Sequence, residues 1–181
     1  CSNRLVELPE GIGGLHALQV LELSENMLTV LPNTLALLPS LQMLNLGVNL
    51  LVELPREIGH LSCLQILRLE GNKLKFLPKS FGCLSSLQAL HLDDNVLVAL
   101  PESFGQLRAL QTLEASGNML STLPESLGQL ENLQHLDLHA NQLSSLPDSI
   151  GLLASLEFLC LDRNQLSALP AGFGLLARLR S

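Results

Sequence analysis

The sequence predicts an α/β solenoid, in which short repeats stack side by side and each adds one strand to a parallel β-sheet. Asparagine recurs every 23 residues, and a Leu-Pro pair keeps the same spacing. The asparagines are Asn3, Asn26, Asn49, Asn72, Asn95, Asn118, Asn141 and Asn164. A regular period of about 20 to 50 residues is typical of a solenoid, because one repeat cannot bury its apolar side chains alone.

Each part of the repeat predicts one local element. The unit reads L-x-x-L-x-L-x-x-N-x-L-x-x-L-P-x-x-(I/L/F)-G-x-L-x-x. The L-x-L segment predicts a short strand with Leu21 and Leu23 pointing inward and Glu22 outward, because successive side chains of a strand alternate between its faces. Asn then turns the chain and pairs with backbone groups.

The return half of the repeat begins at the Leu-Pro pair. Proline fixes φ and suits a first helical turn, so the pattern predicts a turn, a 3-10 helix or a short α-helix there. The glycine that follows is expected to permit a tight bend, and Ala36 is the exception to it. Ala115 replaces an inward leucine, which predicts a thin or repacked spot in the core.

The repeats predict a single domain over residues 1–181. It comprises a partial repeat (1–17), seven full repeats (18–178) and the start of another (179–181). Terminal repeats of a solenoid normally carry a polar cap, which neither end shows. We therefore expect a fragment of a longer protein.

The net charge and the hydropathy of the chain limit the kinds of partner that it is expected to bind. The net charge of −7 argues against nucleic acid, whose phosphates need clustered Lys and Arg, and favours a protein with a basic surface. The sequence shows no signal peptide and no apolar run near about 20 residues, so no membrane insertion is expected. Asn-x-Ser/Thr sequons are absent.

The cysteines form no CxxC pair. They are Cys1, Cys63, Cys83 and Cys160. We interpret them as free thiols in a reducing compartment, which predicts a cytoplasmic location. Cys63 and Cys83 fall on adjacent return segments, but a disulfide between them is not predicted.

The Leu-Pro-x-x-Ile-Gly-x-Leu segment with its 23-residue period resembles the leucine-rich-repeat superfamily. It is most similar to the branch of Scribble, Erbin and the plant Ras-group leucine-rich-repeat proteins, and similar repeats occur in some bacteria. The resemblance covers the whole chain. It implies a horseshoe with the parallel sheet on its concave face and turns, 3-10 or short helices on its convex face. It also implies protein recognition, with a small GTPase as one candidate partner.

Binding specificity in a solenoid lies in the outward strand positions, because the matching residues are scaffold. The predicted partner-binding residues on the concave face are Val20, Glu22, Met43, Asn45, Ile66, Arg68, Glu70, His91, Asp93, Glu114, His135, Asp137, His139, Phe158, Cys160 and Asp162. The first half of this surface is apolar, which favours either a partner anchor or scattered exposed side chains. The second half is acidic, which favours either attraction of a basic ligand or a solvated face.

Metal binding is the weaker interpretation of the histidines. His135, Asp137 and His139 alternate along one strand. Glu114 and Cys160 flank Asp137 on the neighbouring strands, and Asp162 lies beside His139. All of these are metal-ligand types. However, alternate residues of a strand lie roughly 6.6 Å apart. We therefore favour ordinary surface histidines and predict neither a metal nor a cofactor.

An enzymatic function is not predicted. His91 or His135 near Glu114 resembles an acid–base pair, but an open sheet offers no enclosed pocket, and no nucleophile elbow or phosphate loop is present. Cys160 is expected to be unreactive, because nearby carboxylates raise the pKa of a thiol.

The sequence thus predicts a protein-interaction module of an intracellular signalling or scaffold protein, which binds its partner on the concave face. Two alternatives remain. The chain is the recognition or sensor domain of a larger multidomain enzyme, such as a kinase, GTPase regulator or ubiquitin ligase. Otherwise it belongs to a bacterial surface or effector protein.

Overall fold

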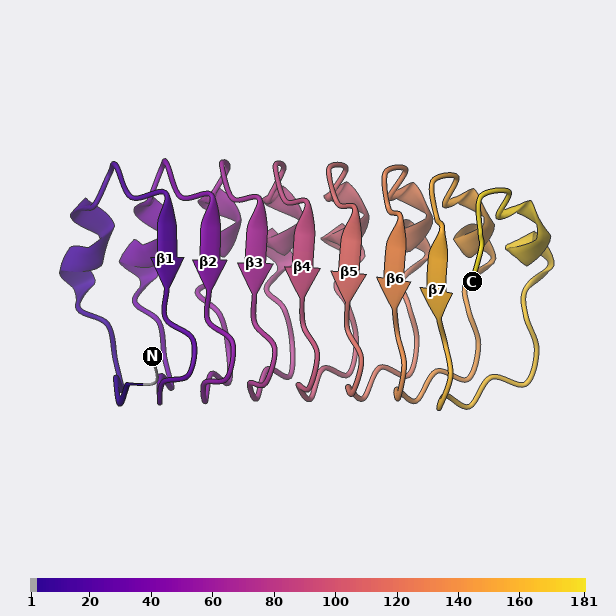
Figure 1. The fold of residues 1–181 in the computed structure, drawn as a ribbon, viewed down its shortest axis with the longest axis horizontal. Helices are drawn as coiled ribbons and strands as arrows, with labels where there is room; N and C mark the ends of the chain where they lie inside the picture. The colour runs from indigo at the N-terminus through magenta and orange to yellow at the C-terminus, as the bar shows by residue number, and fades with distance from the viewer. Residues whose placement is uncertain (1–2) are drawn as a thin grey trace.

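The computed structural model describes residues 3–181 and forms one open sheet of seven parallel strands, with eight 3-10 helices on the opposite side (Figure 1). The strands are β1 (Val20–Glu22), β2 (Met43–Asn45), β3 (Ile66–Arg68), β4 (Ala89–His91), β5 (Thr112–Glu114), β6 (His135–Asp137) and β7 (Phe158–Cys160). This confirms the predicted solenoid. Cys1, one of the four predicted free thiols, lies outside the described residues.

The return segments form the second layer. The 3-10 helices are η1 (Glu10–Gly14), η2 (Asn33–Leu37), η3 (Ile58–His60), η4 (Lys79–Cys83), η5 (Glu102–Gln106), η6 (Glu125–Gln129), η7 (Asp148–Leu152) and η8 (Ala171–Leu175). All but η3 begin directly after the proline of the Leu-Pro pair, as the sequence predicts. No helix among them is long and apolar enough to cross a membrane.

Each strand pairs with the next along the chain, in a register of one repeat. Val20 pairs with Met43, and Met43 pairs with Ile66, so equivalent residues form continuous columns across the sheet. The middle residue of each strand points inward, and Leu44 and Leu67 are fully buried. The core therefore lies between the sheet and the row of 3-10 helices. Ala115 is also fully buried within it.

A ladder of asparagine side chains ties the repeats together. Asn95 Oδ1 accepts a hydrogen bond from the backbone N–H of Leu74 at 3.0 Å. Its amide group donates to the carbonyl oxygens of Leu69 and Leu92, at 2.9 and 3.0 Å. One side chain thus satisfies backbone groups of its own turn and of the preceding repeat, which confirms the predicted role of the asparagine.

The residue just before each ladder asparagine from Asn26 to Asn164 has a left-handed backbone. The positions with φ between 52° and 66° are Glu25, Val48, Gly71, Asp94, Gly117, Ala140 and Arg163. The turn out of the strand therefore depends on this residue as well as on the asparagine. A β-branched residue such as Val48 is strained in this conformation, because its Cβ crowds the backbone.

Replacing Val48 with glycine is expected to raise the free energy of unfolding by about 1 kcal/mol, because the left-handed conformation penalises a side chain. Val48 is 56% exposed, so the substitution removes little buried surface. Urea unfolding measures the change. Val52 is the matched control, since it is also 56% exposed but its φ is not positive. Val52→Gly should destabilise the protein, and equal losses in both variants would contradict the strain at Val48.

The regular spacing of glycine after the Leu-Pro pair has a different cause from the one expected. The chain does turn tightly there, in a 3-10 helix, but the described glycines of this position do not have positive φ, so the turn does not need the conformational freedom of glycine. A Cβ added to Gly82 would instead lie 2.1 Å from the carbonyl oxygen of Ser103. The glycine is therefore needed for close packing against the next return segment. Ala36 carries a methyl group at this position, and the next helix, η3, has three residues where the others have five.

Candidate protein-interaction surface

The outward residues of the strands and the residues two positions beyond each strand form one surface, here called the sheet face. The third residue of each strand forms one column of this face. The column runs through paired residues from Glu22 on β1 to Cys160 on β7, as predicted. The predicted partner-binding residues lie on this face, each half-buried or exposed. The geometry thus displays these residues together on one face of the sheet.

The first strands display apolar side chains. Val20, Met43 and Ile66 pair across β1, β2 and β3, and Val20 is 52% exposed. Val48 and Met27, which follow the first two strands, are also exposed. This part of the sheet face therefore presents neighbouring apolar groups rather than isolated ones.

A second apolar contact lies on the last strands. The rings of His135 and Phe158 stack with their centroids 4.3 Å apart and an angle of 4° between the planes. Sequence reasoning placed both residues in one column but did not predict the stack. The signal was an aromatic ring and a histidine at the same position of adjacent repeats.

Two buried polar atoms occupy the middle of the sheet face without a hydrogen-bond partner among the described residues. They are Arg68 Nε and Glu70 Oε2. The side chains approach each other, with Arg68 Nη1 3.9 Å from Glu70 Oε1. Gly47 makes room for the carboxylate, since a Cβ there would lie 2.5 Å from Glu70 Oε1. These two atoms are closed off from solvent, so a partner can contact only the exposed parts of the Arg68 and Glu70 side chains, which are 41% and 30% exposed.

Local hydrogen bonds hold the acidic residues of the second half in place. His91 Nδ1 lies 2.5 Å from Glu114 Oε2. Asp93 Oδ1 accepts hydrogen bonds from the backbone N–H and the hydroxyl of Ser116, at 3.0 and 2.7 Å. These carboxylates are therefore oriented before any ligand arrives.

Asp162 joins two neighbours near the end of the sheet. The Cys160 thiol donates a hydrogen bond to Asp162 Oδ1 at 2.8 Å, and His139 Nδ1 lies 2.7 Å from Asp162 Oδ2. The hydrogen bond to Asp162, then burial and the negative charge of Asp137, raise the pKa of Cys160 to about 11. The hydrogen bonds from Cys160 and His139 lower the pKa of Asp162. The thiol is therefore protonated near neutral pH, in the direction that the sequence predicts.

The metal-ligand types gather across strands rather than along one strand. His135 stacks on Phe158, while Asp137 Oδ1 accepts a hydrogen bond from the backbone N–H of His139 at 2.8 Å. Two other groups have their ligand atoms within 4.8 Å of one another in the described chain. They are His139 with Cys160 and Asp162, and His91 with Asp93 and Glu114. The sequence places Asp162 beside His139 and His91 near Glu114, at an offset of 23 residues, but it did not single out either three-residue group.

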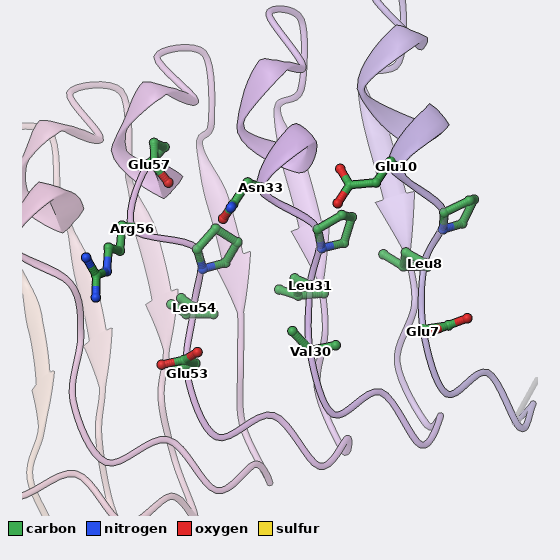
Figure 2. Close-up of a pocket in the computed structure, with 13 residues that line it drawn as sticks. Glu7, Leu8, Glu10, Val30, Leu31, Asn33, Glu53, Leu54, Arg56 and Glu57 are labelled. Atoms are coloured by element: carbon green, nitrogen blue, oxygen red, sulfur yellow. The ribbon is translucent and has the colours of Figure 1, made fainter.

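A hollow of about 850 Å³ lies away from the sheet face, over the return segments of the first three repeats. Figure 2 shows Leu8, Leu31 and Leu54 at equivalent places on successive return segments. Four glutamates and one arginine also line the hollow, namely Glu7, Glu10, Glu53, Glu57 and Arg56. Sequence reasoning missed this feature because it considered only the strand positions.

The thiols on the return segments are accessible. Cys63 and Cys83 are both exposed and free. They are therefore available to solvent, in contrast to the hydrogen-bonded thiol of Cys160.

Profiles of leucine-rich-repeat families match most of the chain. A profile described as a leucine-rich repeat region matches residues 38–119. Two more, described as a leucine rich repeat and as two copies of leucine-rich repeats, match residues 1–51 and 108–151. No curated protein sequence matches the chain.

Solved structures of leucine-rich-repeat proteins are similar to the chain. The ectodomain of the plant membrane receptor kinase GASSHO1/SCHENGEN3 from Arabidopsis thaliana, in complex with CASPARIAN STRIP INTEGRITY FACTOR 2, is 34% identical with a TM-score of 0.81. That match covers 92% of this chain and 21% of the receptor chain. A TDR receptor is also 34% identical with a TM-score of 0.84, over 96% of this chain and 31% of its own. A third match is the Leptospira interrogans protein LIC12759, with 30% identity, a TM-score of 0.45, and coverage of 99% and 69%.

Three observations indicate the same family. They are the profile matches, the 23-residue period and the parallel sheet with one strand per repeat. The chain spans about a fifth and about a third of the two receptor chains. The repeats alone are therefore what is shared. The chain belongs to the leucine-rich-repeat family.

Proposed function

We propose that this chain is the protein-recognition segment of an intracellular signalling or scaffold protein, and that the sheet face is its binding surface. The observation that carries the proposal is the row of exposed or half-buried apolar side chains Val20, Met43 and Ile66, which shares the sheet face with the acidic residues of the later strands. A partner that supplies both an apolar anchor and hydrogen-bonding groups would satisfy this arrangement.

Charge indicates the chemistry of the partner. The sheet face carries Glu114, Asp137 and Asp162 on neighbouring repeats, and the chain has a net charge of −7. Such a field accelerates association with a basic protein surface. The similar receptor from Arabidopsis thaliana is described in complex with a factor, which supports ligand recognition as the role of such repeats. We propose a non-catalytic role.

The intracellular location rests on the thiols. Cys63 and Cys83 are exposed and free, a state that persists in reducing compartments. Fractionation of cells that express the tagged native protein tests this location. Recovery of the protein only from the secreted fraction would contradict it.

The similarity to a membrane receptor kinase favours a second candidate function. Here the chain is the recognition domain of a larger multidomain enzyme whose catalytic part lies elsewhere. Both candidates use the sheet face for binding. Mass spectrometry of the intact native protein separates them, because it shows whether a catalytic domain accompanies the repeats.

Reversing two charges of the sheet face tests the binding surface. Asp93→Lys with Asp137→Lys is expected to weaken affinity for the native partner at least tenfold, a loss of about 1.4 kcal/mol, because the basic partner then meets like charges. Titration calorimetry with a partner identified by crosslinking measures the change.

The matched control reverses the same number of charges away from the sheet face. Glu102→Lys with Glu125→Lys alters two exposed residues of η5 and η6 and should leave the affinity unchanged. An equal loss of affinity in both double variants would show that binding depends on the net charge of the chain and not on the sheet face. No loss in the sheet-face variant would contradict the proposed surface.

A further inference from the structure

Three different ligand types converge on the sheet face between β6 and β7. His139 lies two residues beyond β6, Cys160 ends β7, and Asp162 lies two residues beyond β7. The His139 Nδ1 and Asp162 Oδ2 atoms are 2.7 Å apart, and the Cys160 Sγ and Asp162 Oδ1 atoms are 2.8 Å apart. One ligand atom from each residue lies within 4.8 Å of the others.

We propose that His139, Cys160 and Asp162 bind one zinc ion. An imidazole nitrogen, a thiolate sulfur and a carboxylate oxygen are the three ligand types that Zn²⁺ uses in proteins. Mg²⁺ and Ca²⁺ prefer oxygen ligands alone, so the sulfur favours a softer ion. Three protein ligands leave the fourth tetrahedral position to water.

The spacing of the donors suits such an ion. Zinc–ligand bonds of about 2.0–2.3 Å place the donors of a tetrahedral site roughly 3–4 Å apart. The present donors lie within 4.8 Å, and small rotations of the side chains, which are half-buried or exposed, bring them to that separation. Zinc binding deprotonates the Cys160 thiol and releases the proton to solvent. A zinc–sulfur bond then replaces the S–H bond.

The scaffold holds the donors on fixed backbone. Asn164 donates hydrogen bonds to the carbonyl oxygens of Leu138 and Leu161, which precede His139 and Asp162, at 2.9 Å each. Asp137 Oδ1 accepts a hydrogen bond from the backbone N–H of His139. Strands β6 and β7 pair through Asp137 and Cys160. Little ordering is therefore needed when the ion binds.

The chain offers its own comparison site. His91, Asp93 and Glu114 also bring three ligand atoms within 4.8 Å, but they include no sulfur. Asp93 Oδ1 already accepts two hydrogen bonds from Ser116. This group is therefore the poorer zinc site and serves as the control.

The test uses zinc calorimetry and cobalt absorption on the whole chain. The background carries Cys1→Ser, Cys63→Ser and Cys83→Ser, so that Cys160 is the one thiol left in the sequence that can bind cobalt. We expect one zinc ion per chain and, with Co²⁺, a near-ultraviolet sulfur-to-cobalt absorption band. Cys160→Ser should abolish the band and weaken zinc affinity at least tenfold. His139→Ala should weaken it to a similar degree, and circular dichroism checks that both variants fold.

The control variant decides between the two clusters. His91→Ala should retain the stoichiometry, the affinity and the cobalt band. The absence of zinc binding at micromolar concentrations would overturn the proposal. Zinc binding that survives Cys160→Ser without loss, or that disappears in His91→Ala, would overturn it as well.

Discussion

Asn95→Ala is expected to lower the free energy of unfolding by about 3–5 kcal/mol. The substitution leaves the buried N–H of Leu74 without its acceptor, and an unsatisfied buried donor costs roughly 1–3 kcal/mol. It also removes the hydrogen bonds to the carbonyl oxygens of Leu69 and Leu92, each worth roughly 1 kcal/mol. Urea unfolding followed by circular dichroism measures the loss.

Asn26 provides the matched control for this prediction. Its Oδ1 accepts from the exposed N–H of Leu5, which water can satisfy in its place. Its amide donates to Leu23 and Ser24 of its own repeat. Asn26→Ala should therefore cost clearly less than Asn95→Ala. A loss below about 1 kcal/mol for Asn95→Ala would contradict the stabilising role of the ladder.

Gly105→Ala is expected to destabilise the protein by about 1–3 kcal/mol, because overpacking forces backbone shifts in a close-packed region. The added Cβ would lie 2.2 Å from the carbonyl oxygen of Ser126 and 2.8 Å from its Cβ. The neighbouring return segment must therefore move. Thermal unfolding measures the loss as a lower Tm.

A glycine in open space provides the comparison for Gly105. A Cβ added to Gly11 meets nothing within 4 Å, and its φ is not positive. Gly11→Ala should leave the Tm unchanged or raise it slightly, because alanine reduces the entropy of the unfolded chain. If both variants lost the same stability, close packing between return segments would not explain the glycine.

The repeat pattern predicts the scaffold in detail. The positions of Leu44 and Asn95 imply an inward side chain and a backbone-pairing amide, and the structure confirms both. Such predictions succeed because every repeat meets the same physical requirement at the same position. The reason given for the glycines was wrong, since a sequence does not reveal how closely two backbones approach. The left-handed residue was missed, because Val48 and Arg163 share no residue type.

For the sheet face, the sequence predicts which residues lie side by side on neighbouring strands, but not which side chains contact each other. The register follows from the period, so the pairing of His91 with Glu114 is fixed by the sequence. Which side chains then contact each other depends on rotamers, and the period carries no such information. For this reason the sequence places Asp162 beside His139 but also groups His139 with Asp137 and His135 on its own strand, without deciding between these neighbours. In the structure its side chain pairs with Asp162 of the next repeat.

In the described part of the chain, the side-chain hydrogen bonds of the ladder asparagines from Asn26 to Asn164 stay within one repeat or reach one repeat back, across 26 residues at most. A unit of 23 residues can therefore be duplicated, deleted or exchanged without disturbing any contact beyond its immediate neighbours. Such an exchange moves a whole set of outward residues at once. The array can acquire a new recognition pattern by recombination of intact units, while the scaffold that supports it stays the same.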